Sequence, residues 1–223
     1  MGSRRRKRRR AAHGGLREVA HIHVAGRVVT ISQDGKAIDH VTEALISNRS
    51  EAGYWAVLWP SSSALAVMTS AADDLTGKRI IEVGCGVGAA GLVAAALGAE
   101  VILSDIEPRA LDIVQANADA NQLQVQTLAM DWNHPPEDLG TFDGILAADV
   151  MYDTGMMRGV LRFIRRHLRP GGIAAVTDPN RVMPGGVSGA ARLHGLEVSS
   201  LPLVAGTSAA GGITLHYLMR KKR

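Results

Sequence analysis

The chain has 223 residues, of which 46% are hydrophobic and only 4% aromatic, so it suits one well-buried α/β domain and is short for two. The formal net charge is +4, but eleven basic residues crowd the two ends, and the remainder has 14 basic against 21 acidic residues. No stretch approaches the roughly 20 apolar residues of a membrane-spanning helix, and the N-terminus lacks the apolar segment of a signal peptide, so we expect no membrane span.

The first 15 residues form a basic leader, in which seven Arg and Lys residues are adjacent at 4–10. A run of like charge without apolar partners is more often solvated than folded, so we expect residues 1–15 to be disordered. The alternative is a weak electrostatic attraction of an anionic partner, such as a nucleic acid, to these arginines. Residues 16–223 are expected to form the folded domain.

Two elements are predicted ahead of the main core. Residues 21–32, HIHVAGRVVTIS, alternate in polarity around Gly26 and indicate a β-hairpin. A polar stretch follows, and Pro60 with the three serines after it then opens an apolar, alanine-rich helix within 54–70. His21 and His23 fall on one face of the edge strand, and none of the eight histidines has metal-ligand spacing, so we expect no metal site.

From residue 78 onward, strands alternate with helices. Strands are predicted at 78–83, 100–105, 125–131, 142–149 and 171–178, and helices at 89–97, 108–121, 155–168 and 185–194. The last two strands, 196–204 and 212–220, have no helix between them and predict an antiparallel closing hairpin. The fold class is therefore α/β: a Rossmann-like, doubly wound, seven-stranded sheet over 78–219, with this C-terminal hairpin and the small N-terminal hairpin.

Four glycines crowd the turn after the first core strand, in IIEVGCGVGAAG at 80–91. From Gly86 the loop matches the G-x-G-x-x-G pattern of dinucleotide sites; from Glu82 it matches the acidic-x-Gly-x-Gly-x-Gly loop that binds S-adenosylmethionine (SAM) in seven-strand methyltransferases. The motif alone does not choose between these ligands, although the absence of a following Lys-Ser/Thr excludes an NTPase phosphate loop. Cys85, the only cysteine, excludes an intrachain disulfide and favours a reducing, cytoplasmic location.

Acidic residues close four core strands: Glu82, Asp105, Asp131 and Asp149. The carboxyl ends of strands in a doubly wound sheet converge on the ligand crevice. Asp105 can accept hydrogen bonds from both ribose hydroxyls, a feature that NAD enzymes share, whereas Asp131 and the adjacent Trp132 offer an acceptor and an indole for an adenine ring. SAM has a cationic sulfonium and no pyrophosphate, so acidic surroundings favour SAM over NAD.

With these motifs the chain resembles the family-16 seven-strand methyltransferases, whose members include protein lysine methyltransferases. The resemblance extends over roughly 21–219 and depends on the order of VLWPSSSALA (57–66), the glycine loop, LSDIEP (103–108), DW (131–132) and LAADVMYD (146–153). Asp149-Val150-Met151-Tyr152 has the family's Asp-x-x-Tyr form. YWAVLWP and TDPNR are most similar to the branch that methylates the β subunit of electron-transfer flavoprotein, but Asn180 and Ser61-Ser62 depart from that branch.

The resemblance implies a site in which Asp149 and Tyr152 are the catalytic residues facing the methyl acceptor. The implied cofactor-binding residues are Trp59, Glu82, Gly84, Cys85, Gly86, Gly88, Asp105, Asp131, Trp132 and Ala148. Among them, Asp105 would bind the ribose, Trp132 the adenine, and Ala148 would lie beneath the transferring methyl group. A lysine acceptor, whose unperturbed pKa is roughly 10.4, would bind Asp149 as an ammonium and must lose a proton before it reacts.

The sequence thus predicts SAM-dependent N-methylation of a lysine in a protein substrate. Methylation of a small-molecule amine or hydroxyl is the alternative, a non-catalytic module that binds SAM or nucleic acid is more remote, and a dehydrogenase is the remotest. Each site residue also has an ordinary structural interpretation. The aspartates would then cap strand ends, Trp59 and Trp132 would be half-buried packing residues, and Cys85 would fill space in the loop.

Overall fold

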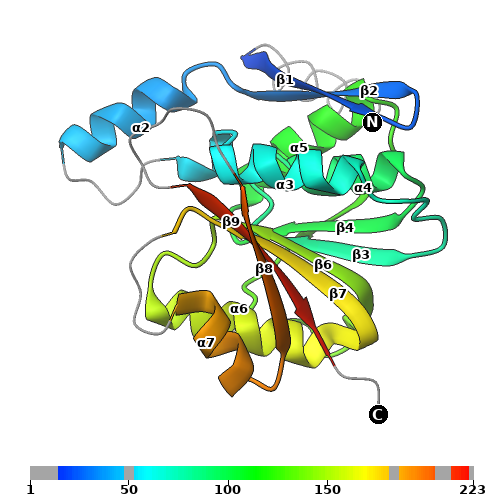
Figure 1. Ribbon diagram of the computed structural model, residues 1–223. Helices are drawn as coiled ribbons and strands as arrows, with labels where there is room; N and C mark the ends of the chain where they lie inside the picture. Colours follow the sequence, from blue (N-terminus) through cyan, green and yellow to red (C-terminus); the bar gives the residue numbers. More distant parts are fainter. Residues whose placement is uncertain (1–14, 48–52, 181–185, 204–211, 221–223) are drawn as a thin grey trace.

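The computed structural model describes residues 15–47, 53–180, 186–203 and 212–220 (Figure 1). Seven strands form one sheet in the order β5-β4-β3-β6-β7-β9-β8. The pairs among β3 to β7 are parallel, whereas β9 is antiparallel to both β7 and β8. The predicted α/β fold with its closing hairpin is confirmed. The strands are β3 (Arg79–Val83), β4 (Glu100–Asp105), β5 (Gln126–Ala129), β6 (Phe142–Ala148), β7 (Leu168–Asp178), β8 (Glu197–Leu203) and β9 (Ile213–Met219).

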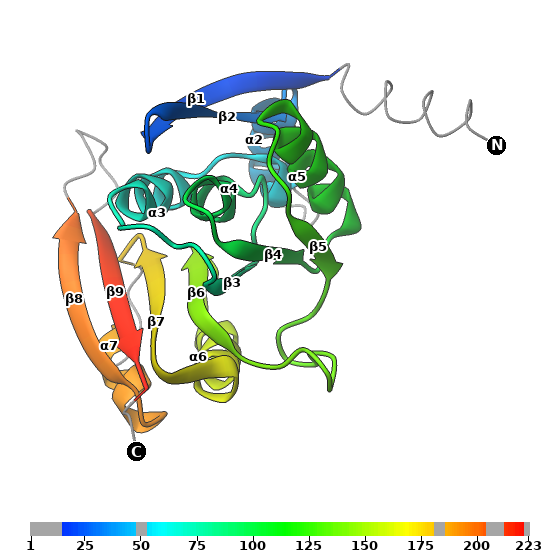
Figure 2. The same ribbon diagram turned by 90° about the vertical axis from the view of Figure 1, so that its right-hand side faces the viewer.

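Helices cover both faces of this sheet (Figure 2). One face carries α3 (Pro60–Ser70), α4 (Ala89–Ala96) and α5 (Pro108–Ala120), and the other carries α6 (Thr154–His167) and α7 (Gly186–Leu193). Proline occupies the first position of α3 and of α5, where its missing N–H has no helical partner to lose. The side chain of Asp153 caps α6 by accepting a hydrogen bond from Met156 N at 2.8 Å. Because these prolines and this capping residue can be recognised in the sequence, the helices begin close to their predicted positions.

The N-terminal hairpin is a separate two-stranded sheet of β1 (Leu16–Val24) and β2 (Arg27–Asp34), longer than predicted, and packs over α5. Asn117 Oδ1 accepts from Ser32 N and its Nδ2 donates to Ser32 O, both at 2.9 Å. One helical turn later, Asn121 makes the same two bonds with Thr30, both at 2.7 Å. The two amides satisfy the edge of β2 as a neighbouring strand would, and thereby attach the hairpin to α5.

Two elements after the hairpin were not predicted. Where the sequence indicated only a polar stretch, the structure has helix α2 (Ala37–Ile46), and the 3-10 turn η1 (Tyr54–Ala56) precedes α3. The buried residues Val41 and Ala44 of α2 pack against Val57 and Trp59. Of the basic leader predicted at 1–15, residues 1–14 lie outside the described residues. Within the described ranges, no helix is long and apolar enough to span a membrane.

Candidate functional site

The parallel pairing brings the acidic strand ends to one edge of the sheet. Glu82 of β3 is opposite Leu103 of β4 on one side and Leu146 of β6 on the other. Asp105 is the last residue of β4 and Asp149 directly follows β6, so both lie beside the loop that leaves β3. The strand order therefore places Glu82, Asp105 and Asp149 at the same edge of the sheet, and their roles in a ligand crevice remain predictions.

The loop after β3 requires glycine because of its backbone conformation and because neighbouring atoms leave no space for side chains. Gly84, Gly86 and Gly88 have φ angles of +61°, +52° and +79°, in the left-handed region that side chains disfavour. A Cβ on Gly84 would also lie 2.6 Å from Val150 Cγ1, and one on Gly86 would lie 3.1 Å from the carbonyl oxygen of Trp55. The loop is thus enclosed on both sides by other parts of the chain.

Asp105 holds the glycine loop and the next turn together. Its Oδ2 accepts from Gly86 N at 2.9 Å and its Oδ1 accepts from Glu107 N at 3.0 Å. Asp105 is only 7% exposed, and this burial raises the pKa of its carboxyl group against the opposing effect of backbone hydrogen bonds. Each oxygen retains a second lone pair, so the same carboxylate can still accept hydrogen bonds from ligand hydroxyls. Ile106, the next residue, is 65% exposed beside it and was not predicted as a site residue.

Glu82 lies beneath the loop at the amino end of α4. Its Oε2 accepts from Gly91 N at 2.7 Å, and burial of the side chain, 2% exposed, raises its pKa to about 8. In a dinucleotide site, the pyrophosphate binds to the amides at this helix end. Here a buried carboxyl group already accepts from an amide in the first turn of α4, which disfavours an anionic ligand. Cys85 is also buried, and burial raises the pKa of its thiol, so it remains protonated.

Asp131 and Trp132 follow β5, but their contacts differ. Asp131 Oδ1 accepts from Asn133 N at 2.8 Å and its Oδ2 lies 2.9 Å from His134 Nδ1, so the carboxylate is bound to its own loop, and these contacts lower its pKa. The Trp132 ring lies against the glycine loop, with Cζ3 3.3 Å from the position of a Cβ on Gly84. Within the described ranges its buried indole nitrogen has no hydrogen-bond partner. The adenine-binding roles of both residues remain predictions.

The loop after β6 holds the predicted catalytic pair. Asp149 has a φ of +56°, a left-handed conformation that is uncommon for a residue with a side chain and is concentrated at functional sites. Its N–H donates to Thr177 O at 3.0 Å, which fixes it to the end of β7. The next two residues are buried, whereas Tyr152 is 51% exposed, and Ala148 is a small buried residue at the end of β6. This alternation anchors the loop and leaves Tyr152 accessible.

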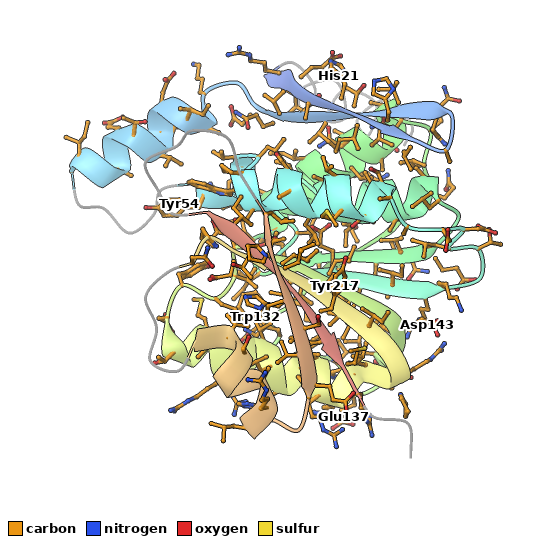
Figure 3. All side chains as sticks on the ribbon, viewed as in Figure 1. His21, Tyr54, Trp132, Glu137, Asp143 and Tyr217 are labelled. Carbon is orange, nitrogen blue, oxygen red and sulfur yellow. The ribbon has the colours of Figure 1, made fainter. Side chains whose placement is uncertain are left out.

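The segment before α3 is rich in aromatic residues, and one of them, Trp55, lies beside the glycine loop. Trp59 precedes the first residue of α3, and its indole Nε1 donates to Tyr54 O at 2.8 Å (Figure 3 labels Tyr54). Trp55 was not predicted, yet its carbonyl faces Gly86 and its ring lies under the Arg109 guanidinium, 4.9 Å from Cζ to the ring centroid. The chain has three tryptophans, and two of them lie within this short segment. That concentration was the signal in the sequence that could have identified Trp55.

Asn117 also binds the glycine loop, and the sequence analysis did not identify it. Its Nδ2 donates to Val87 O at 3.0 Å, in addition to its bonds with β2, so the hairpin and the glycine loop share one buried amide.

Among the residues that the structure describes, no group of three or more His, Cys, Asp or Glu side chains is arranged to hold a metal ion.

Comparison with known sequences identifies methyltransferases as relatives. The chain is 34% identical over 141 residues to "Protein N-lysine methyltransferase METTL21A" of Danio rerio, covering 60% of this chain and 58% of the relative. It is 29% identical over 131 residues to "Electron transfer flavoprotein beta subunit lysine methyltransferase" of Danio rerio, covering 57% and 50%. It is 35% identical over 115 residues to "Histone-arginine methyltransferase METTL23" of Mus musculus, covering 48% and 46%. The chain spans about half the length of these curated relatives.

A solved structure and a family profile agree with these relatives. The 16S rRNA N2 G1207 methyltransferase RsmC of T. Thermophilus, in complex with AdoMet and guanosine, has a TM-score of 0.67 at 18% identity, covering 92% of this chain and 51% of that chain, which supports the fold. The profile described as "Lysine methyltransferase" matches residues 41–176, more than half of the chain, and this segment contains the glycine loop and all four strand-end acids. The chain belongs to the lysine methyltransferase family.

Proposed function

We propose that this chain binds SAM and transfers its methyl group to the side-chain nitrogen of a lysine in a protein. The observation that carries the proposal is the pair of buried carboxyl groups, Glu82 and Asp105, that hydrogen-bond to the glycine loop and to the start of α4. Burial raises the pKa of both carboxyl groups, and a nearby cationic sulfonium would favour their ionised forms, whereas a pyrophosphate would oppose ionisation. Membership of the family, together with relatives named as lysine methyltransferases, supports the same conclusion.

The residues around the loop fit the parts of SAM. Asp105 retains lone pairs for the ribose hydroxyls, and the exposed Ile106 together with Trp132 offers apolar surface for the adenine. Gly84 and Gly86 are half-buried, so part of their backbone is exposed to the methionine portion. When bound, SAM supplies an activated methyl group on a sulfonium that is a good leaving group. The chain's own task is then to position the acceptor and to exclude water.

Asp149 and Tyr152 are proposed to prepare the acceptor. A lysine at neutral pH arrives as an ammonium, since its unperturbed pKa is roughly 10.4, and the Asp149 carboxylate would bind it. Loss of a proton to water or to a nearby base then exposes the nitrogen lone pair. Tyr152 is 51% exposed and its phenol can orient this nitrogen, and the small Ala148 leaves space beneath the methyl group.

The proposal is tested by the substitution Asp149→Asn, which keeps the shape of the side chain and removes its charge. Labelled SAM and a cell lysate first identify the acceptor, and turnover is then measured on the purified substrate. Turnover should fall by roughly 10² while SAM affinity changes only a few-fold, because the lost interaction concerns the acceptor. Tyr152→Phe should show a milder loss. Glu100→Gln, at the exposed far end of β4, is the control and should be unaffected.

Other outcomes would redirect the proposal. Near-wild-type turnover of Asp149→Asn would refute the lysine mechanism and favour a neutral small-molecule acceptor. Parallel loss of SAM binding would make Asp149 a cofactor ligand. Label in an arginine would match the name of the mouse relative instead.

We also propose a cytoplasmic location, supported by the free thiol of Cys85.

A further inference from the structure

Helix α6 carries a concentration of arginine that the proposed catalytic site does not use. Its inner side is apolar and buried, whereas Arg158, Arg162, Arg165 and Arg166 follow one another at the spacing of a single helix face. Arg158, Arg162 and Arg166 are exposed and Arg165 is half-buried. We call these four residues the arginine face.

Within the described ranges, the positive charges of the arginine face are not neutralised by ion pairs. Across the described ranges, no carboxylate oxygen lies within 4.0 Å of its four guanidinium groups. A long hydrogen bond of 3.4 Å joins Arg162 Nη2 to Asn133 Oδ1. The acid at the start of the helix, Asp153, is engaged in capping the backbone. Four cations are therefore held side by side on a rigid element, without neutralising partners in the described part of the chain.

The rest of the body has the opposite charge. Between the two basic ends, 14 basic residues face 21 acidic ones, and the arginine face alone supplies four of the 14. Helix α6, which carries these arginines, lies on the side of the sheet opposite the N-terminal hairpin, α2 and α5 (Figure 2). That opposite side carries many of the acidic residues, among them Asp34, Asp39, Glu43, Asp112 and Asp119. The arginine face is thus a local cationic strip on an acidic molecule.

We infer that the arginine face binds an acidic segment of the protein substrate, an inference that rests on the proposed function. Helix α6 begins two residues after Tyr152, so the strip leads away from the loop that would hold the methyl acceptor. From Arg158 to Arg166 it extends about 12 Å at the helical rise, the length of about four residues of extended chain. Guanidinium groups bind carboxylates through paired hydrogen bonds, which gives orientation as well as attraction.

The strip fits a short acidic polypeptide better than a nucleic acid. A phosphate polymer has charge along its whole length and would continue beyond the strip onto the acidic body. Sites for single-stranded nucleic acid also interleave basic residues with aromatic platforms. The exposed aromatic residues of the described ranges, Tyr54 and Tyr152, both lie outside α6.

The test uses the full chain and a binding readout that needs no methyl transfer. The variant Arg158→Glu with Arg162→Glu reverses two charges of the strip, and the control Arg17→Glu with Lys36→Glu makes the same change at exposed positions on the hairpin side. Fluorescence anisotropy measures the Kd of a labelled polyglutamate peptide of about eight residues at about 50 mM salt, where surface charges are weakly screened. Melting temperatures confirm that both variants fold.

The strip variant should weaken polyglutamate binding by about tenfold or more and should flatten its salt dependence, with the control changing less than about threefold. Equal effects of the two variants would show that only overall charge matters and would overturn the inference. Loss of binding to a single-stranded RNA of similar charge, with polyglutamate binding unchanged, would assign the strip to nucleic acid and also overturn it. With an identified substrate, the strip variant should raise KM and leave SAM affinity unchanged. Failure of the catalytic proposal would instead appear as near-wild-type turnover of Asp149→Asn, whatever the strip variant does.

Discussion

The buried carboxyl group of Glu82 makes a quantitative prediction about stability. We consider Glu82→Gln, which keeps the length of the side chain and an oxygen that can accept the hydrogen bond from Gly91 N. The substitution removes the ability to ionise and puts an NH2 donor in place of the second carboxyl oxygen. Because the two side chains have nearly the same size and the amide does not titrate, the pH-dependent part of the difference in stability reports ionisation of the buried Glu82 rather than lost packing.

The magnitude follows from the pKa of Glu82 in the two states. Burial raises it to about 8 in the folded chain, from an unperturbed value of 4.5. A group whose pKa is raised by folding contributes stability that is complete below the unfolded pKa and is lost as the pH rises toward the folded one. Between about pH 5 and pH 7, proton linkage for these two values removes about 2 to 3 kcal/mol from the free energy of unfolding. Glutamine should abolish this loss.

Denaturant unfolding at both pH values measures the prediction. The free energy of unfolding of the wild type should fall by about 2 to 3 kcal/mol more than that of Glu82→Gln between about pH 5 and pH 7. Asp105, whose pKa is also raised, is present in both proteins, so only its electrostatic interaction with Glu82 remains in the difference. Glu100→Gln, at an exposed position, should follow the wild-type curve.

Ligand binding provides an independent readout of the same group. A cationic sulfonium favours the ionised carboxylate, so SAM affinity of the wild type should increase as the pH rises toward about 8 and then level off. S-adenosylhomocysteine, which lacks the sulfonium, should show a weaker dependence, and Glu82→Gln should show almost none. Parallel pH curves for wild type and variant, in both unfolding and binding, would refute the conclusion that Glu82 is protonated in the folded chain.

Two further substitutions test the cofactor loop. Asp105→Ala should weaken SAM binding by roughly 1 to 3 kcal/mol in calorimetry, because buried ligand hydroxyls lose a charged acceptor, and NAD should not bind; a response to NAD but not to SAM would overturn the cofactor assignment. Gly91→Ala should lower the free energy of unfolding by roughly 1 to 3 kcal/mol, because its Cβ would lie 2.4 Å from Leu103 Cδ2 and 2.9 Å from Glu82 Oε2. Gly189→Ala, with no heavy atom within 4 Å of the new Cβ, is the matched helical control, and equal effects of the two would contradict the close packing of α4 on β4.

The sequence by itself determined the element order and the position of the glycine loop. These depend on local chemistry: the alternation of strands, prolines at helix starts, and glycines at positions where φ is positive. The acids at strand ends were also predictable, because parallel strands connected by helices must present their carboxyl ends at one edge. Helix α2 escaped prediction because its buried residues Val41 and Ala44 are defined only by contact with Val57 and Trp59.

Only the tertiary structure decided which groups surround the loop and in what state. Asn117 joins β2 to the glycine loop across 85 and 30 residues of sequence, and the carbonyl of Trp55 faces Gly86 from a separate turn. The raised pKa of Glu82 comes from burial, which no local pattern reports. Within the described ranges, the arginine face lacks neutralising partners because of where the acids of distant segments lie in space. Local propensity acts over a few residues, whereas burial, electrostatics and close approach depend on segments that meet only in the folded chain.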